Sequence, residues 1–263
     1  MLISLLIKAL VRMDTSVQPL FYGYFVVLGV AACCLLWSFF SWLFPKISTA
    51  YSKHFKPIQR ADMLARGVAC VHAYFLFFLA IYMLWFDPER ALLNDHGNGY
   101  PKSSPLLGLS TGYFIFDLLV MFIHGKPVFS YAFLLHHSLC IIGWTTLVLT
   151  RNGLFFPVFQ SLCEFTNIFV SLHWFYCNAP GWKTSKAFIF NGLCLLVTFT
   201  IFRESLLVYS IYLVYTDFPF SYLLPFNKVF LLISSVLLNG LNLYWYSKIV
   251  RGLVRKFSKP KNQ

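Results

Sequence analysis

The stretch FLLHHSLCII, residues 133–142, places two adjacent histidines inside an otherwise apolar run. The run extends from about residue 130 to residue 150, which is long enough for a helix to cross the hydrocarbon core of a bilayer. An ionisable ring at that depth is costly, and it normally faces a cavity or a partner inside a helical bundle. His136 and His137 therefore indicate a membrane-spanning helix with one side turned towards a polar interior.

Similar apolar runs recur along the chain. They lie at 19–44, 66–86, 106–124, 130–150, 153–178, 186–216 and 226–250. The composition agrees with them, since 59% of the residues are hydrophobic and only 11% are charged, far from the values of soluble domains. The sequence predicts an all-α fold, a polytopic bundle of about seven transmembrane helices. We expect 1–18 to form an amphipathic lead-in, 19–44 the first transmembrane helix and 251–263 a basic tail.

The basic residues gather in short clusters between the apolar runs. A net charge of +12 would suggest nucleic acid in a soluble chain, but here the clusters encode topology, and no nucleic-acid partner is expected. Alternating spans place 14 Lys and Arg on one side and six on the other, which predicts a cytosolic C-terminus. The terminal KPKNQ, with Lys259 and Lys261, resembles a retrieval signal to the endoplasmic reticulum that a coat protein would bind. A basic tail in contact with anionic lipid is the alternative.

Further polar residues lie inside the apolar runs on shared helical faces. Asp117 and His124 are seven residues apart, and Glu164, Asn167 and Ser171 follow the spacing i, i+3, i+7. Arg203 lies near the middle of the sixth run. It can hold a lipid phosphate or carboxylate through its planar fork, or it can neutralise a carboxylate of the bundle. The candidate lipid-binding residues of a polar cavity are Asp117, His124, Asn167, Ser171 and Arg203.

The two histidines have several possible roles. Consecutive residues on a helix differ by about 100°, so one ring can face the cavity while the other faces a neighbouring helix. A neutral imidazole can act as a base or a nucleophile, and a carboxylate such as Glu164 or Asp117 can fix its tautomer. If the chain is an enzyme, the catalytic candidates are His136, His137 and Glu164. Hydrogen bonding between helices is the alternative, and no metal site is expected, because adjacent histidines ligate poorly and the cysteines lack C-x-x-C spacing.

Four ordered motifs together resemble a known family. They are TGYFIFDLL (111–119), LLHHSLCIIGW (134–144), TRNG (150–153) and LCEFTNIFVSLHWF (162–175). In this order they resemble the TLC domain family, with a predicted domain of six transmembrane helices over roughly residues 50–250. The resemblance implies a membrane of the endoplasmic reticulum or a related compartment. It also implies a bundle around a central cavity that lipids can enter.

Members of that family differ in function. Ceramide synthases share the histidine pair and carry a second motif, a histidine and two aspartates on the next helix. Those three positions fall on Gln160, Ser161 and Glu164 here, so only one acidic group remains. This departure favours a protein of lipid homeostasis that binds membrane lipid in the cavity without a cofactor. The alternative is a lipid acyltransferase of the sphingolipid type with acyl-CoA as co-substrate. A transporter is a third possibility, although the chain shows no inverted repeat.

Overall fold

The computed structural model describes residues 18–91, 102–126, 128–206, 208–209, 212, 216 and 222–257. This part of the chain contains seven helical segments long and apolar enough to cross a membrane, and no strand. The predicted all-α polytopic fold is therefore confirmed, and the chain is an integral multi-pass membrane protein. The predicted lead-in, apart from its last residue, lies outside the described residues, as do Lys259 and Lys261.

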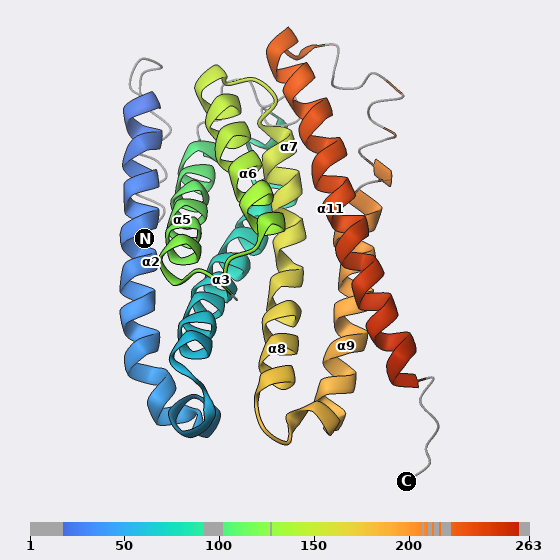
Figure 1. Cartoon of the computed structure of the whole chain (residues 1–263). Helices are drawn as coiled ribbons and strands as arrows, with labels where there is room; N and C mark the ends of the chain where they lie inside the picture. The colour runs from blue at the N-terminus through green and yellow to red at the C-terminus, as the bar shows by residue number, and fades with distance from the viewer. Residues whose placement is uncertain are drawn as a thin grey trace.

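Single helices form four of the spans, and irregular turns interrupt or end the others (Figure 1). The α-helices are α2 (Gln18–Ile47), α3 (Pro57–Ile81), α5 (Ser103–His124), α6 (Tyr131–Thr150), α7 (Phe155–Gln160), α8 (Thr166–Asn178), α9 (Lys186–Phe199) and α11 (Pro225–Phe257). The 3-10 turn Ser161–Phe165 joins α7 to α8, and π turns at Tyr82–Phe86 and Thr200–Glu204 extend α3 and α9. Short helical turns at Ala50–His54 and Trp182–Thr184 lie in the connections.

The second span begins earlier than the apolar pattern predicted. It starts at Pro57 instead of near residue 66, with proline at the first helical position, where its fixed φ is already suitable. The Gln59 side chain accepts a hydrogen bond from the backbone N–H of Lys56 at 3.0 Å and caps this end. The first turns are polar, because Asp62 and Arg66 form an ion pair at 2.9 Å. Hydropathy alone could not detect these turns.

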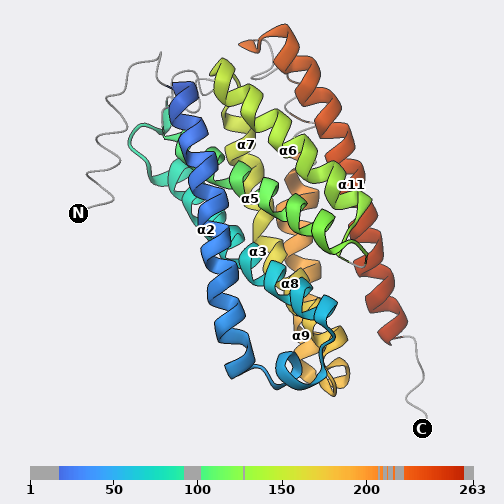
Figure 2. The same ribbon diagram turned by 60° about the vertical axis from the view of Figure 1, so that its left-hand side comes forward.

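Close backbone contact defines the packing of α2 against α5. A Cβ added at Gly112 would overlap the carbonyl oxygen of Val26, and one added at Gly29 would overlap that of Leu109. The absence of side chains lets the two helices approach closely, as is common where transmembrane helices meet. Tyr22 strengthens this seam, since its hydroxyl lies 2.8 Å from the Thr111 hydroxyl. Figure 2 shows α2 running beside α5 and α3.

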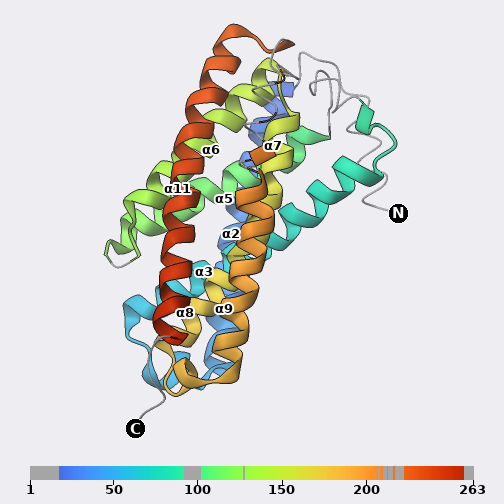
Figure 3. The same ribbon diagram turned by 90° about the vertical axis from the view of Figure 1, so that its right-hand side faces the viewer.

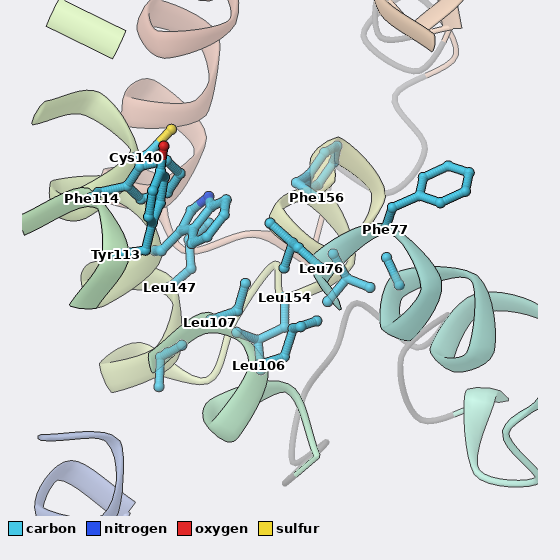
Figure 4. Close-up of a cluster of buried hydrophobic side chains, with 14 of the residues drawn as sticks. Leu76, Phe77, Leu106, Leu107, Tyr113, Phe114, Cys140, Leu147, Leu154 and Phe156 are labelled. Carbon is cyan, nitrogen blue, oxygen red and sulfur yellow. The ribbon is translucent and has the colours of Figure 1, made fainter. Parts of the chain in front are cut away.

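A hydrophobic core fills the space between α3, α5, α6 and α7. Leu76 of α3, Leu106 and Leu107 of α5, and Leu147 of α6 are almost fully buried in one cluster (Figure 4). Phe114 joins this cluster from the part of α5 that also borders the site described below. The core therefore fixes the positions of the helices that supply the site.

The connections rich in basic residues gather at one end of the bundle. The α2–α3 and α8–α9 connections and the C-terminal end of α11 all lie at the bottom of Figure 1. Helix α9 begins at that end and α11 finishes there, and the two lie side by side, as Figure 3 also shows. The structure thus supports the alternation of spans on which the charge count relied.

Candidate functional site

A cavity of about 650 Å³ lies inside the bundle between α3, α5, α6, α8, α9 and α11. Its walls are mainly apolar, with side chains such as Val170, Ile189 and Leu253. Seven of the eight predicted site residues line it: Asp117, His136, His137, Glu164, Asn167, Ser171 and Arg203. The polar stripes that the spacing predicted on separate helices therefore meet in one cavity.

His137 is paired with Asp117 across the α5–α6 interface. Its Nε2 lies 2.8 Å from Oδ2 of Asp117, and only 5% of the residue is exposed. Nδ1 of the ring is buried and has no hydrogen-bond partner among the described residues. The carboxylate therefore fixes the orientation of the ring.

His136 approaches a different carboxylate. Its Nε2 lies 3.9 Å from Oε1 of Glu164, while Oε2 of Glu164 accepts a hydrogen bond of 2.6 Å from the Asn167 amide. Glu164 belongs to the 3-10 turn between α7 and α8, and Asn167 follows in the first turn of α8. The two adjacent histidines thus face two different acidic groups, as the 100° step between neighbouring helical residues requires.

Arg203 lies in the π turn that extends α9 and is 5% exposed. Its Nε donates to the Thr166 hydroxyl at 2.9 Å, and its Nη1 donates to the side-chain Oδ1 of Asn242 at 3.0 Å. The guanidinium also lies over the rings of Phe199 and Trp245, with Cζ 5.2 and 5.6 Å from their centroids. No described carboxylate is in ion-pair contact with it, so it does not neutralise Glu164 or Asp117 directly.

His124 does not line this cavity, and its prediction as a cavity residue is wrong. It is the last residue of α5, and its ring stacks on Trp37 of α2 with a centroid distance of 6.0 Å. Asp117 and His124 do share a helical face, but two turns separate them along the axis. At the level of His124, helix α2 packs against that face, and the cavity does not reach it.

Several charged residues of the cavity wall were not predicted as site residues. These are Asp62, Arg66, Lys183, Lys248 and Arg255. Lys183, Lys248, Arg255 and also Arg66 were interpreted only as markers of topology. Asp62 lies in a helical turn that precedes the apolar run at 66–86. Lys248 and Arg255 carry one usable signal, because their spacing of seven residues puts them on one face of α11.

The substituted positions of the second motif lie away from this cavity. Ser161 is fully buried, and its hydroxyl donates to the carbonyl oxygen of Pro157 at 2.7 Å. Gln160 borders a much smaller pocket between α6, α7 and α11. Within the described residues, no group of three or more His, Cys, Asp and Glu side chains is arranged to hold a metal ion.

Comparison with known proteins identifies the family to which this chain belongs. The family model of the TLC domain matches residues 62–251, which include at least part of every helix that lines the cavity. The chain belongs to the TLC domain family. Human TLC domain-containing protein 4 is 28% identical over 231 residues, which cover 85% of this chain and 86% of that protein.

Other relatives in the TLC domain family have a similar sequence identity to this chain. TLC domain-containing protein 4-B of Danio rerio is 29% identical over 81% of this chain and 83% of its own length. TLC domain-containing protein 1 of Gallus gallus is 29% identical over 70% of this chain and 71% of its own length. No solved structure matches the chain. The resemblance seen in the four motifs is thus confirmed.

Proposed function

We propose that this TLC-domain protein binds a membrane lipid in the cavity and acts in the control of membrane lipid composition. One observation carries the proposal: a cavity of about 650 Å³ combines mainly apolar walls with a few buried or half-buried polar side chains. Binding pockets for amphiphiles have this character, since apolar walls bury the chain and a few polar groups orient the head. Asp117, Glu164 and Arg203 supply those polar groups.

Lipid retained through purification tests this proposal. We expect native mass spectrometry of the detergent-purified protein to show bound lipid. Ile189→Trp should reduce the amount of bound lipid, because Ile189 lines the cavity and the larger tryptophan side chain would fill part of it. Phe190→Trp is the matched control, since Phe190 is the next residue on α9 and is 69% exposed on the outer face. Equal lipid in both variants, with unchanged thermal stability, would contradict the proposal.

We also propose that the protein resides in the endoplasmic reticulum with its C-terminus in the cytosol. The support is the Lys-x-Lys-x-x ending together with the excess of basic residues at one end of the bundle. Replacing Lys259 and Lys261 by serine should release a tagged chain to later compartments. Replacing Lys256 by serine, which removes a tail charge outside the motif, should leave the distribution unchanged.

Acyl transfer is a second candidate, favoured by the His137–Asp117 pair. A histidine held by a carboxylate in a lipid-sized cavity can accept an acyl group or take a proton from the acceptor, with acyl-CoA as the donor. Incubation with acyl-CoA followed by intact-protein mass spectrometry tests this. An acyl adduct that disappears in His137→Ala or His136→Ala would support the reaction, and its absence in the wild type would exclude a histidine as the acyl acceptor.

A further inference from the structure

Three cations lie along one wall of the cavity, on α9 and α11. Arg203 is at the inner end, and Lys248 and Arg255 follow on α11. Since Lys248 and Arg255 are seven residues apart, they share one helical face with a separation of about 10 Å along the axis. Trp245 connects the inner end to this row, because its ring lies 5.6 Å from Cζ of Arg203 and Lys248 is one turn further.

The acidic groups of the cavity and their histidine partners lie on other helices than these cations. Asp117 comes from α5 and Glu164 from the turn before α8, and each faces a histidine of α6. Arg66 of α3 also borders the cavity, but Asp62 neutralises it with an N···O distance of 2.9 Å. The two walls of the cavity are therefore unlike in charge, and the α9–α11 wall is the basic one.

Among the described residues, no carboxylate lies within ion-pair distance of the three cations on the α9–α11 wall. Arg203 is held by two neutral oxygens, and its Nη2 makes no hydrogen bond to the described residues. Lys248 lies over the Tyr244 ring, with Nζ 4.1 Å from the centroid. The three charges are thus not balanced by an ion pair with any described carboxylate. A buried guanidinium with unused donors inside a membrane is costly unless an anion or another acceptor reaches it.

We propose that Arg203, Lys248 and Arg255 form a basic track that selects a lipid with an anionic head group, a phosphate or a carboxylate. The head group enters at Arg255, passes Lys248 and is held at Arg203, whose planar fork matches both anions. Thr166 and Asn242 fix the guanidinium before the lipid arrives, so little side-chain entropy is lost on binding. This inference rests on the proposed function and adds the class of lipid.

Competition between lipids tests the track. The purified protein is exchanged into mixed micelles with equal amounts of phosphatidylcholine and either phosphatidic acid or oleic acid, and the bound lipid is measured by native mass spectrometry. We expect the wild type to prefer at least one of the two acidic lipids. Arg203→Gln should lower that preference by about tenfold or more, and Lys248→Gln or Arg255→Gln by about two- to fivefold.

Arg251→Gln is the matched control, because Arg251 is an exposed cation of the same helix that bonds to Ser247 and does not line the cavity. It should leave the preference unchanged. A loss in Arg251→Gln equal to that in Lys248→Gln would overturn the track, because general surface charge would then explain the selection. A wild type that binds lipid without preference would overturn this inference alone, whereas one that binds no lipid would overturn the proposed function as well.

If Arg203→Gln fails to fold, the two exposed positions still decide the matter. Lys248 and Arg255 are both exposed at the surface of α11, so their substitution by glutamine should not disturb packing. Preference unchanged in both variants would exclude a track along α11. A graded loss, larger at Lys248 than at Arg255, is the expected result, because Lys248 lies nearer to the inner end.

Discussion

The two sides of this bundle are built in opposite ways. On one side α2 packs on α5 so closely that Gly29 and Gly112 leave no room for a side chain. On the other side α9 and α11 stand around a cavity, and their inner faces carry Arg203 and Lys248. Helix α2 contributes no residue to the cavity lining. The comparison teaches that helices of similar length and hydropathy can serve either as scaffold or as site.

The two sides also use polar groups differently. At the seam, Tyr22 joins two helices through neutral hydroxyls, at 2.8 Å to Thr111 and 2.9 Å to Thr145. In the cavity, ionisable groups such as Asp117 and His137 face open space as well as each other. We therefore expect substitutions at the seam to act on stability alone. Substitutions in the cavity should act on ligand binding and, where they leave a buried group without its partner, on stability as well.

The largest effect should come from overpacking the seam. Gly112→Leu would force α2 away from α5, because the new side chain meets the Val26 backbone, and we expect a loss of about 3 kcal/mol or more. Thermal unfolding in detergent measures this. Gly23→Leu, on the facing helix α2, is the control, since a Cβ there meets nothing within 4 Å. Similar stability in both variants would show that the seam is not the scaffold.

Removal of the Asp117 carboxylate tests whether the cavity also contributes to stability. Asp117→Ala leaves Nε2 of the buried His137 ring without its partner, at an expected cost of about 2 kcal/mol. Asp117→Asn should recover most of this loss, because an amide can still bond to the ring. Equal losses in the alanine and asparagine variants would mean that charge, and not the hydrogen bond, holds the pair.

A smaller effect is expected at the polar bridge of the seam. Tyr22→Phe keeps the ring but removes the hydroxyl that lies between Thr111 and Thr145, and we expect a loss of about 1 kcal/mol. Lipid retention should remain at the wild-type level. A change in bound lipid without a change in stability would break the division between scaffold and site.

The smallest effect concerns Lys102, at the start of α5 and outside the membrane spans. Burial acts to lower the pKa of Lys102, but the hydrogen bonds and charges of Asp87 and Glu89 outweigh it and raise the pKa above its ordinary value. A raised pKa means that the contribution to stability is complete below the ordinary value of about 10.4 and is lost as the pH rises through the folded-state pKa.

Thermal unfolding of the wild type and of Lys102→Met across that range measures this contribution. The stability difference between the two proteins should shrink as the pH rises above about 10.4. A difference that stays constant with pH would show that the ammonium charge is not what holds Asp87, whose Oδ1 lies 2.7 Å from Nζ.

Much of the site was predictable because membrane burial makes polar residues conspicuous. Asp117, Glu164 and Arg203 stand out in apolar runs, and helical spacing grouped several of them correctly. The cations near the ends of the spans were not conspicuous. Basic residues there are ordinary, so the cavity role of Lys183, Lys248 and Arg255 was hidden by their role in topology.

The sequence by itself determined the number of spans and the family, because hydrophobic run length and motif order are local properties of the chain. It also determined that His136 and His137 face different directions, since that follows from helical geometry alone. Only the tertiary structure decided that Asp117 meets His137, that Glu164 approaches His136, and that His124 packs on Trp37. Those pairings depend on how α2, α5, α6 and α8 cross, and crossing is set by side-chain packing between segments distant in sequence.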